Sequence, residues 1–145
     1  MTQMQFKLVF SAAALALLTL CMAECSSAQV TRQIQVTLSH PFIVGNTTLP
    51  PGKYDFRMVP NSDLSLMTVT SADGNTAAEF PIRDSEADHV PQHTELVFNR
   101  YGKEEYLRRI FEKGKQLGVS VDEPSRKELR LQQSGQHPVE HTESQ

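Results

Sequence analysis

Polar and apolar residues alternate in several short stretches of this chain, and a period of two is typical of half-buried β-strands. Gln33–Leu38 alternates strictly, and Tyr54, Phe56 and Met58 alternate with charged residues. Other stretches combine β-branched or aromatic residues with turn signals at both ends. These further predicted strands cover residues 41–45, 64–70, 76–82, 94–101 and 105–111.

Glycine, asparagine and proline mark the connections between these strands. Gly45-Asn46, Asp73-Gly74 and Gly102-Lys103 predict tight turns, because glycine and asparagine tolerate a positive φ. Pro81 cannot donate a hydrogen bond to a sheet, so we expect its strand to be an edge strand or to end there. Residues 83–93 are polar and aperiodic, which predicts a loop.

The last third of the chain has weaker signals. Residues 113–121 fit neither period, and residues 124–132 predict a short helix with a proline in its first turn. Residues 133–145 lack apolar periodicity, so we expect disorder. The expected fold is therefore all-β: a small antiparallel sandwich or barrel of six to eight strands, with a short C-terminal helix and a disordered tail.

The first 28 residues have the three parts of a secretory signal peptide: one cation, an uncharged apolar run, and a small-x-small end. The run covers residues 8–20, shorter than the roughly 20 residues of a membrane-spanning helix. Lipidation requires a cysteine directly after a small residue, and neither cysteine of this segment meets that requirement. We expect residues 1–28 to be removed, residues 29–132 to form one domain, and residues 133–145 to form the tail. We expect the domain to be exported to the periplasm or out of the cell, without a membrane anchor.

Composition excludes several kinds of chemistry. Both cysteines lie in the predicted signal peptide, which excludes a disulfide scaffold, a thiol nucleophile and a cysteine-ligated metal in the exported part. The net charge of −3 argues against nucleic-acid binding, which favours a basic excess. No G-x-S-x-G motif and no phosphate-binding glycine loop is present. We expect a protein without enzymatic activity or cofactor; a small hydrolase without a recognisable motif stays open.

Four motifs resemble those of a family of small exported β-rich proteins, numerous in acidobacterial soil bacteria. They are PFxVG from Pro41, LPxGxY from Leu49, FxRYG from Phe98 and PSRxE from Pro124. Pro51 stands where that family usually has alanine. The resemblance implies an exported β-fold and assigns no catalytic residue.

One loop has residues that favour a divalent cation. Carboxylates spaced by two positions are typical of calcium-binding loops, and two histidines with a carboxylate suit zinc. The residues of this candidate calcium or zinc site are Asp84, Glu86, Asp88, His89, His93 and Glu95. His89 stands where a calcium loop needs glycine, so a solvated acidic connection is the competing interpretation. His137 and His141 repeat the histidine spacing in the tail, where we expect no site.

A basic stretch is the candidate surface for a partner, which we expect to be an anionic protein or surface. Its residues are Arg100, Arg108, Arg109, Lys113 and Lys115. In a regular strand Arg108 and Arg109 face opposite sides. We expect Tyr54, Phe56, Tyr101 and Tyr106 to be core residues and not a carbohydrate platform. We therefore predict an exported domain with a binding or structural function and an unidentified partner. Its oligomeric state is left open. The alternative is an exported protein that binds a divalent cation.

Overall fold

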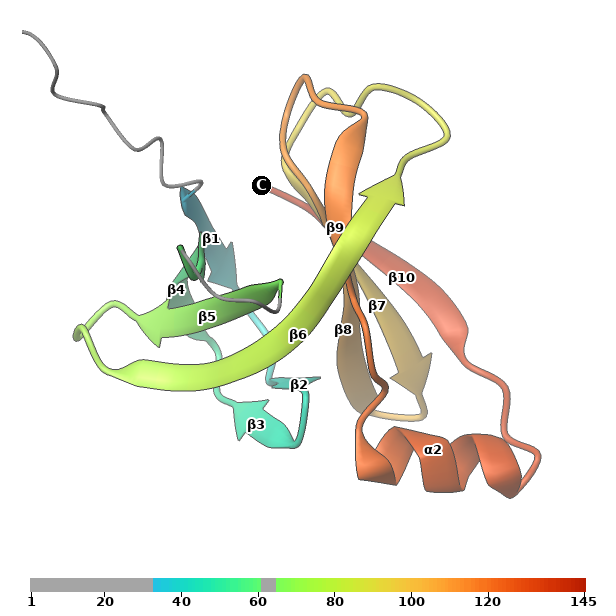
Figure 1. Ribbon diagram of the computed structural model, residues 1–145. Coiled ribbons are helices and arrows are strands. Elements are labelled where there is room, and N and C mark those ends of the chain that lie inside the picture. Colours follow the sequence, from blue (N-terminus) through green and yellow to red (C-terminus); the bar gives the residue numbers. More distant parts are fainter. Residues whose placement is uncertain (1–32, 61–64) are drawn as a thin grey trace, which may run out of the picture. The chain divides into compact units, whose positions relative to one another are not determined.

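The computed structural model describes residues 33–60 and 65–145, which form ten β-strands and one helix (Figure 1). The first strands are β1 (Gln33–Leu38), β2 (Phe42–Val44), β3 (Thr47–Leu49), β4 (Gly52–Met58) and β5 (Leu66–Ser71). The later elements are β6 (Thr76–Glu86), β7 (Glu95–Tyr101), β8 (Glu104–Phe111), β9 (Leu117–Val121), α2 (Arg126–Gln133) and β10 (Val139–Ser144). The predicted all-β fold with a short C-terminal helix is confirmed. The predicted signal peptide lies outside the described residues.

The strands form one hydrogen-bonded series in the order β1-β4-β5-β6-β9-β8-β2-β3, with β7 joined to β8 and β10 to β7. The pairs are antiparallel except β2 and β8, which run parallel where Ile43 meets Tyr106. The long strand β6 sweeps from the group formed by β1, β4 and β5 to the group formed by β7, β8, β9 and β10 (Figure 1). Both groups contribute side chains to one core, as in a β-sandwich.

Strand β6 does not end at Pro81, as the sequence had suggested it could. Its first half pairs with β5 up to Pro81, and its second half pairs with β9 from Ile82 onward. The proline lies where the strand exchanges partners, and its carbonyl accepts a hydrogen bond of 2.9 Å from the amide of Asp122. Residues 83–86, predicted as loop, therefore continue the strand, and the loop covers only residues 87–94.

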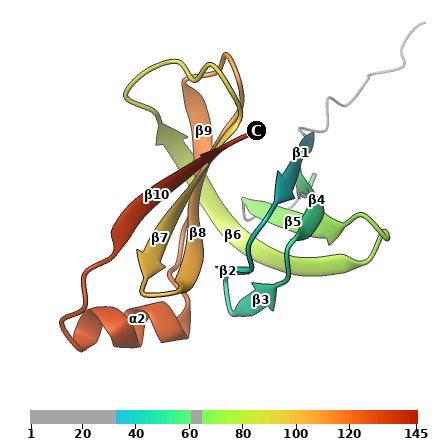
Figure 2. The ribbon, with the colours of Figure 1, turned by 180° about the vertical axis from the view of Figure 1, so that it is seen from behind.

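Three strands escaped the sequence patterns, so the described residues form ten strands and not the expected six to eight. The short strand β3 pairs with β2 directly after the turn at Gly45-Asn46. The ambiguous segment 113–121 contains β9, which pairs with β6 and β8. The prediction of disorder for residues 133–145 is wrong, because β10 pairs with β7 at six positions, from Val139 opposite Arg100 to Ser144 opposite Glu95. Figure 2 shows β10 running alongside β7. The edge of β7 offers backbone N–H and C=O groups, and a polar segment can form hydrogen bonds with them as well as an apolar segment can.

A β-bulge interrupts strand β8. Val97 of β7 pairs with Arg109, but the next residue, Phe98, pairs with Leu107. Arg108 is therefore the extra residue, and Leu107 and Ile110 both enter the main core although they are three positions apart. The expectation that Arg108 and Arg109 face opposite sides is wrong, because a bulge breaks the alternation of side chains.

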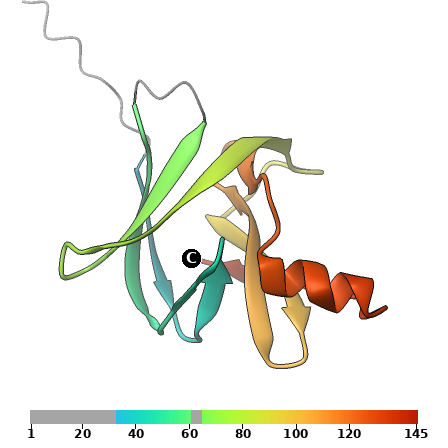
Figure 3. The same cartoon turned by 60° about the horizontal axis from the view of Figure 1, so that its bottom comes forward.

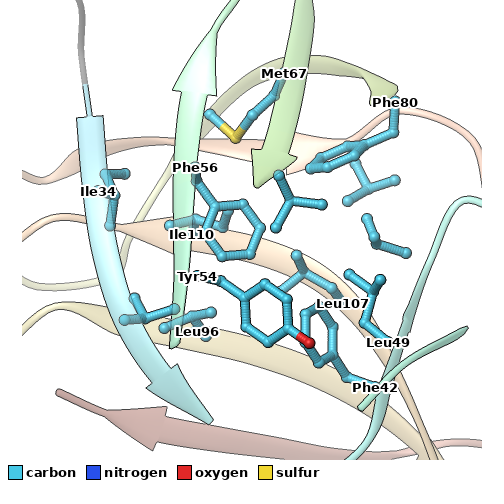
Figure 4. Packing of buried hydrophobic residues seen from close by; sticks show 14 of the residues in the cluster. Ile34, Phe42, Leu49, Tyr54, Phe56, Met67, Phe80, Leu96, Leu107 and Ile110 are labelled. Atoms are coloured by element: carbon cyan, nitrogen blue, oxygen red, sulfur yellow. The ribbon is translucent and has the colours of Figure 1, made fainter. Parts of the chain in front are cut away.

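The main core lies between the two groups of strands. Phe42, Phe56, Met67 and Phe98 are fully buried there. Figure 4 shows side chains from β1, β4 and β5 meeting Leu96, Leu107 and Ile110 from β7 and β8. The four aromatic residues predicted to be core are buried, at 6% exposure or less: Tyr54, Phe56, Tyr101 and Tyr106.

Helix α2 begins at an N-cap serine. The side chain of Ser125 accepts a hydrogen bond of 3.0 Å from the backbone N–H of Glu128, which stabilises the first turn. Leu131 of the helix packs against Tyr101 and Tyr106 of the β7–β8 hairpin, and Figure 3 shows α2 beside this hairpin. Within the described residues, no helix has the length and apolar character needed to cross a membrane.

Candidate functional site

A cluster of ionisable side chains lies where the β7–β8 hairpin, β10 and the β1–β2 connection meet. Its centre is Glu105, which is 6% exposed. Oε2 of Glu105 lies 3.3 Å from Nε2 of His40 and 3.1 Å from Nδ1 of His141. These three ligand-type atoms all lie within 4.8 Å of one another. Side chains from three distant parts of the chain thus converge on one carboxylate oxygen.

Local strand geometry positions the members of this cluster. Gly102, with φ of +62°, forms the hairpin turn that sets Arg100 of β7 opposite Glu105 of β8. On the other side of β7, the register of β10 sets His141 opposite Phe98. Directly opposed residues share one face of a sheet. His141 therefore points to the face that carries Phe98 and lies at the margin of the main core.

The connection between β1 and β2 brings His40 to the same place. Its Nε2 lies 2.7 Å from Oε2 of Glu143, which follows His141 by two positions on β10. Its Nδ1 lies 3.3 Å from the carbonyl oxygen of Pro41. The His40 ring meets the ring of Phe98 edge-on at a centroid distance of 5.4 Å. This apolar neighbour and the half-buried position limit the freedom of the imidazole.

Arg100 also belongs to this cluster. Its Nε donates a hydrogen bond of 2.6 Å to Oε1 of Glu105, and its Nη2 lies 2.8 Å from Nδ1 of His141. One ring nitrogen cannot both accept from the guanidinium and donate to Glu105. Nδ1 of His141 therefore stands between two competing partners, an arginine N–H and a carboxylate oxygen.

Burial and hydrogen bonding act on Glu105 in opposite directions. Burial raises the pKa of its carboxyl group, whereas the hydrogen bonds from His141 and Arg100 and the charges of His40 and His141 lower it. The lowering effects outweigh burial, so the pKa of Glu105 lies below its ordinary value. Glu105 is therefore ionised at neutral pH and offers a negatively charged oxygen to the two histidines.

The predicted cation loop is spread along the chain. Asp84 and Glu86 belong to β6, Asp88, His89 and His93 lie exposed in the following loop, and Glu95 begins β7. Nε2 of His89 lies 4.0 Å from Oε1 of Glu95. Within residues 33–60 and 65–145, the loop residues form no group of three whose ligand atoms all approach within 4.8 Å. A cation site in this loop stays a prediction.

The predicted basic surface is divided among three places. Arg100 belongs to the cluster around Glu105, whereas Arg108 and Arg109 line a pocket on another part of the sheet. Lys113 and Lys115 are exposed in the turn between β8 and β9, where Lys115 forms an ion pair with Glu112. The five residues therefore do not form one continuous patch.

Sequence reasoning missed His40, Glu105 and Glu143 and expected no site at His141. A lone histidine before a proline and a glutamate after a turn carry no pattern that points to a site. The one local signal was the spacing by two of His141 and Glu143, which places both on one face of a strand. That signal has meaning only once residues 139–144 are known to be a strand.

No protein-family model matches this chain, and comparisons with curated proteins and with solved structures found no similar protein. The resemblance to small exported β-rich proteins therefore stays a prediction from its four motifs. The fold defines an all-β protein, and the cluster around Glu105 is the feature of it that points to a function.

Proposed function

We propose that the chain is an exported, non-enzymatic binding domain whose ligand is a divalent transition-metal ion, with Zn²⁺ as the preferred metal. The observation that supports this proposal most is the convergence of His40, Glu105 and His141 on one point. Imidazole nitrogens combined with a carboxylate oxygen are a ligand set that zinc accepts. The chemistry of calcium and magnesium, which prefer oxygen ligands, fits this set less well.

The distances around Glu105 suit a metal centre. With bonds of about 2.0–2.1 Å, two ligand atoms of a tetrahedral zinc site are about 3.3–3.4 Å apart. The separations from Oε2 of Glu105 to the ligand nitrogens of His40 and His141 are 3.3 and 3.1 Å. These two separations match those of a zinc centre, and the third, between the two imidazole nitrogens, is at most 4.8 Å.

The surroundings also support a metal-binding role for His40. A histidine ligand commonly donates its second ring N–H to a carbonyl or carboxylate, which fixes the tautomer. The carbonyl of Pro41, 3.3 Å from Nδ1 of His40, can take this role and leave the Nε2 lone pair for the metal.

Glu143 can complete the coordination. Its Oε2 lies 2.7 Å from Nε2 of His40, on the same face of β10 as His141. Four protein ligands would close the site, whereas catalytic zinc sites keep one position open for water or substrate. A closed site supports a binding or structural role over catalysis.

Thermal melting with and without metal tests the proposal. An untagged chain is compared in chelator, Zn²⁺, Ca²⁺ and Mg²⁺. A ligand that binds only the folded state at 100 times its dissociation constant adds about 2.7 kcal/mol, which raises the midpoint of a domain of this size by several degrees. We expect this rise with Zn²⁺ and its loss in the double variant His40→Ala/His141→Ala.

Two further variants make the result decisive. His137 is exposed and, among the described residues, is not a member of the group His40, Glu105 and His141, so His137→Ala should keep the full zinc response. The double variant His89→Ala/His93→Ala should also keep it. No rise with zinc in the unaltered chain would contradict the proposal. A zinc response lost in His89→Ala/His93→Ala but kept in His40→Ala/His141→Ala would place the metal in the 87–94 loop instead.

A further inference from the structure

A polar pocket of about 410 Å³ lies on the sheet formed by β6, β7, β8 and β9. Side chains that carry hydrogen-bond donors line it from four strands: Arg83, Ser85, Asn99, Arg108, Arg109 and Ser120. Asp84 and Glu140 contribute carboxylates. The pocket is therefore rich in hydrogen-bond donors, and three guanidinium groups line it against two carboxylates.

The bulge in β8 brings both Arg108 and Arg109 to this pocket. In a regular strand only one of Arg108 and Arg109 could line it. Because Leu107 and Ile110 both enter the core, the two arginines between them both line the pocket. Ser120 of β9 lies directly opposite both Arg109 and Arg83 in the strand register. A row of two guanidinium groups with a hydroxyl between them thus crosses three strands.

One donor of this group lacks an acceptor. Nη1 of Arg108 is buried and makes no hydrogen bond. Oε2 of Glu128 lies 3.9 Å from it, beyond hydrogen-bond reach, and Oε1 of Glu128 already accepts from Asn99 at 2.8 Å. A buried donor without a partner is unfavourable, and a guanidinium more so than a neutral group. Arg108 is therefore incompletely paired by the protein. Nη1 itself is covered, so a ligand in the pocket would reach only the other donors of this half-buried guanidinium.

The other two arginines have partners that an anion can displace. Arg109 pairs with Glu140 at 2.6 Å, and Arg83 pairs with Asp122 at 3.5 Å. Glu140 is 60% exposed and Asp122 is 45% exposed, so both pairs are in contact with solvent. Surface ion pairs of this kind contribute little to stability. The cost of exchanging them for a bound ligand is correspondingly small.

From these observations we propose that the pocket binds a tetrahedral oxyanion, a phosphate or sulfate group, with Arg83, Arg108 and Arg109 as its charged donors. Guanidinium groups bind phosphate oxygens through paired, charge-assisted hydrogen bonds. Two serine hydroxyls and the Asn99 amide add neutral donors, so the pocket offers more donors than the two oxygens of a carboxylate can accept. This site is separate from the cluster around Glu105 and does not depend on metal binding there.

Calorimetric titration with inorganic phosphate tests this proposal, in a chelator-containing buffer so that the metal site stays empty. We expect millimolar or tighter binding by the unaltered chain and at least tenfold weaker binding by Arg109→Gln and by Arg83→Gln, which remove exposed or half-exposed side chains and should fold. The matched control is Lys113→Gln/Lys115→Gln, which removes two positive charges outside the pocket and should bind phosphate as before.

Equal phosphate binding by the arginine variants and the unaltered chain would overturn the proposal. So would a signal that sodium chloride of equal ionic strength reproduces. Glucose 6-phosphate and inorganic sulfate identify the source of the group: tighter binding of the sugar phosphate supports an organic phosphate ligand, and tighter binding of the free ions supports an inorganic one. Both results keep the oxyanion assignment.

Discussion

Nδ1 of His141 lies 3.1 Å from Oε2 of Glu105, although 36 positions separate the two residues in the chain. The contact exists because β10 pairs with one edge of β7 while β8 pairs with the other. It joins the final strand to the centre of the ionisable cluster. The candidate site therefore depends on the C-terminal segment, and the consequences of removing that segment can be measured.

Removing residues 137–145 should destabilise the domain and make it self-associate. The truncation removes the strand beside Leu96 and Phe98, which are now fully buried, and full burial of such a side chain contributes roughly 1.5–3 kcal/mol. It also exposes the unpaired edge of β7. We expect a loss of at least about 2 kcal/mol in urea unfolding and a larger mass in light scattering. A truncated chain that stays monomeric and equally stable would show that β10 adds nothing to the fold.

Gly118→Ala should be one of the more damaging substitutions in β9. A Cβ at this position would overlap the carbonyl oxygen of Ile110 and the ring of Phe111. Backbone atoms cannot move away cheaply, so we expect a loss of about 1–3 kcal/mol or more from overpacking. The neighbouring Leu117 is 63% exposed, and Leu117→Ala should stay within about 0.5 kcal/mol of the unaltered chain. Equal stabilities for the two variants in urea unfolding would refute this account of Gly118.

Ser125→Ala should remove the N-cap of α2. The hydroxyl oxygen accepts from the N–H of Glu128, and loss of such a cap costs about 1 kcal/mol. Ser125→Asp keeps an acceptor at the same position and should recover most of the loss. Urea unfolding of the two variants measures the difference. An equal loss in both would show that packing at the buried Ser125, and not capping, sets its contribution.

The β5–β6 hairpin should contribute to stability in a pH-dependent way. Hydrogen bonds from Ser71 and from the side chain and backbone of Asn75 hold the pKa of Asp73 below its ordinary value. A lowered pKa in the folded state gives stability that is present above the unfolded pKa, about 3.9, and lost as the pH falls through the folded value. Asp73→Asn should therefore be destabilising at neutral pH, with a difference that shrinks in acid.

Carboxyl titration by NMR measures the pKa of Asp73 directly. Ser71→Ala should raise it toward the ordinary value, because the hydrogen bond from Ser71 is the largest cause of the shift. A pKa of Asp73 at or above its ordinary value in the unaltered chain would refute this interpretation of the hairpin.

Local patterns predicted much of the fold because they depend only on neighbouring residues. The alternation in β1 and the turn at Gly74, with φ of +85°, are of this kind. Strand β10 has no apolar alternation, since its inward positions carry His141 and Glu143 and the edge of β7 determines its conformation. The bulge at Arg108 likewise depends on the pairing with β7.

The candidate site was harder to predict than the fold for the same reason. His40, Glu105 and His141 come from a connection, a hairpin and the last strand, and no spacing in the chain relates them. The sequence did indicate that histidines and carboxylates were available for a divalent cation. Only the strand order shows which of them meet.

Calorimetric titration of the unaltered chain with Zn²⁺, beside His141→Ala and Arg100→Gln, measures whether this cluster binds zinc. Arg100 now holds Nδ1 of His141 at 2.8 Å, so it competes with a metal for that nitrogen. If the cluster is a zinc site, we expect one zinc ion per chain, loss of that binding in His141→Ala, and tighter binding in Arg100→Gln. Absence of zinc binding in both the unaltered chain and Arg100→Gln would contradict the proposal and leave the cluster as an ion-pair network that holds β10 to the sheet.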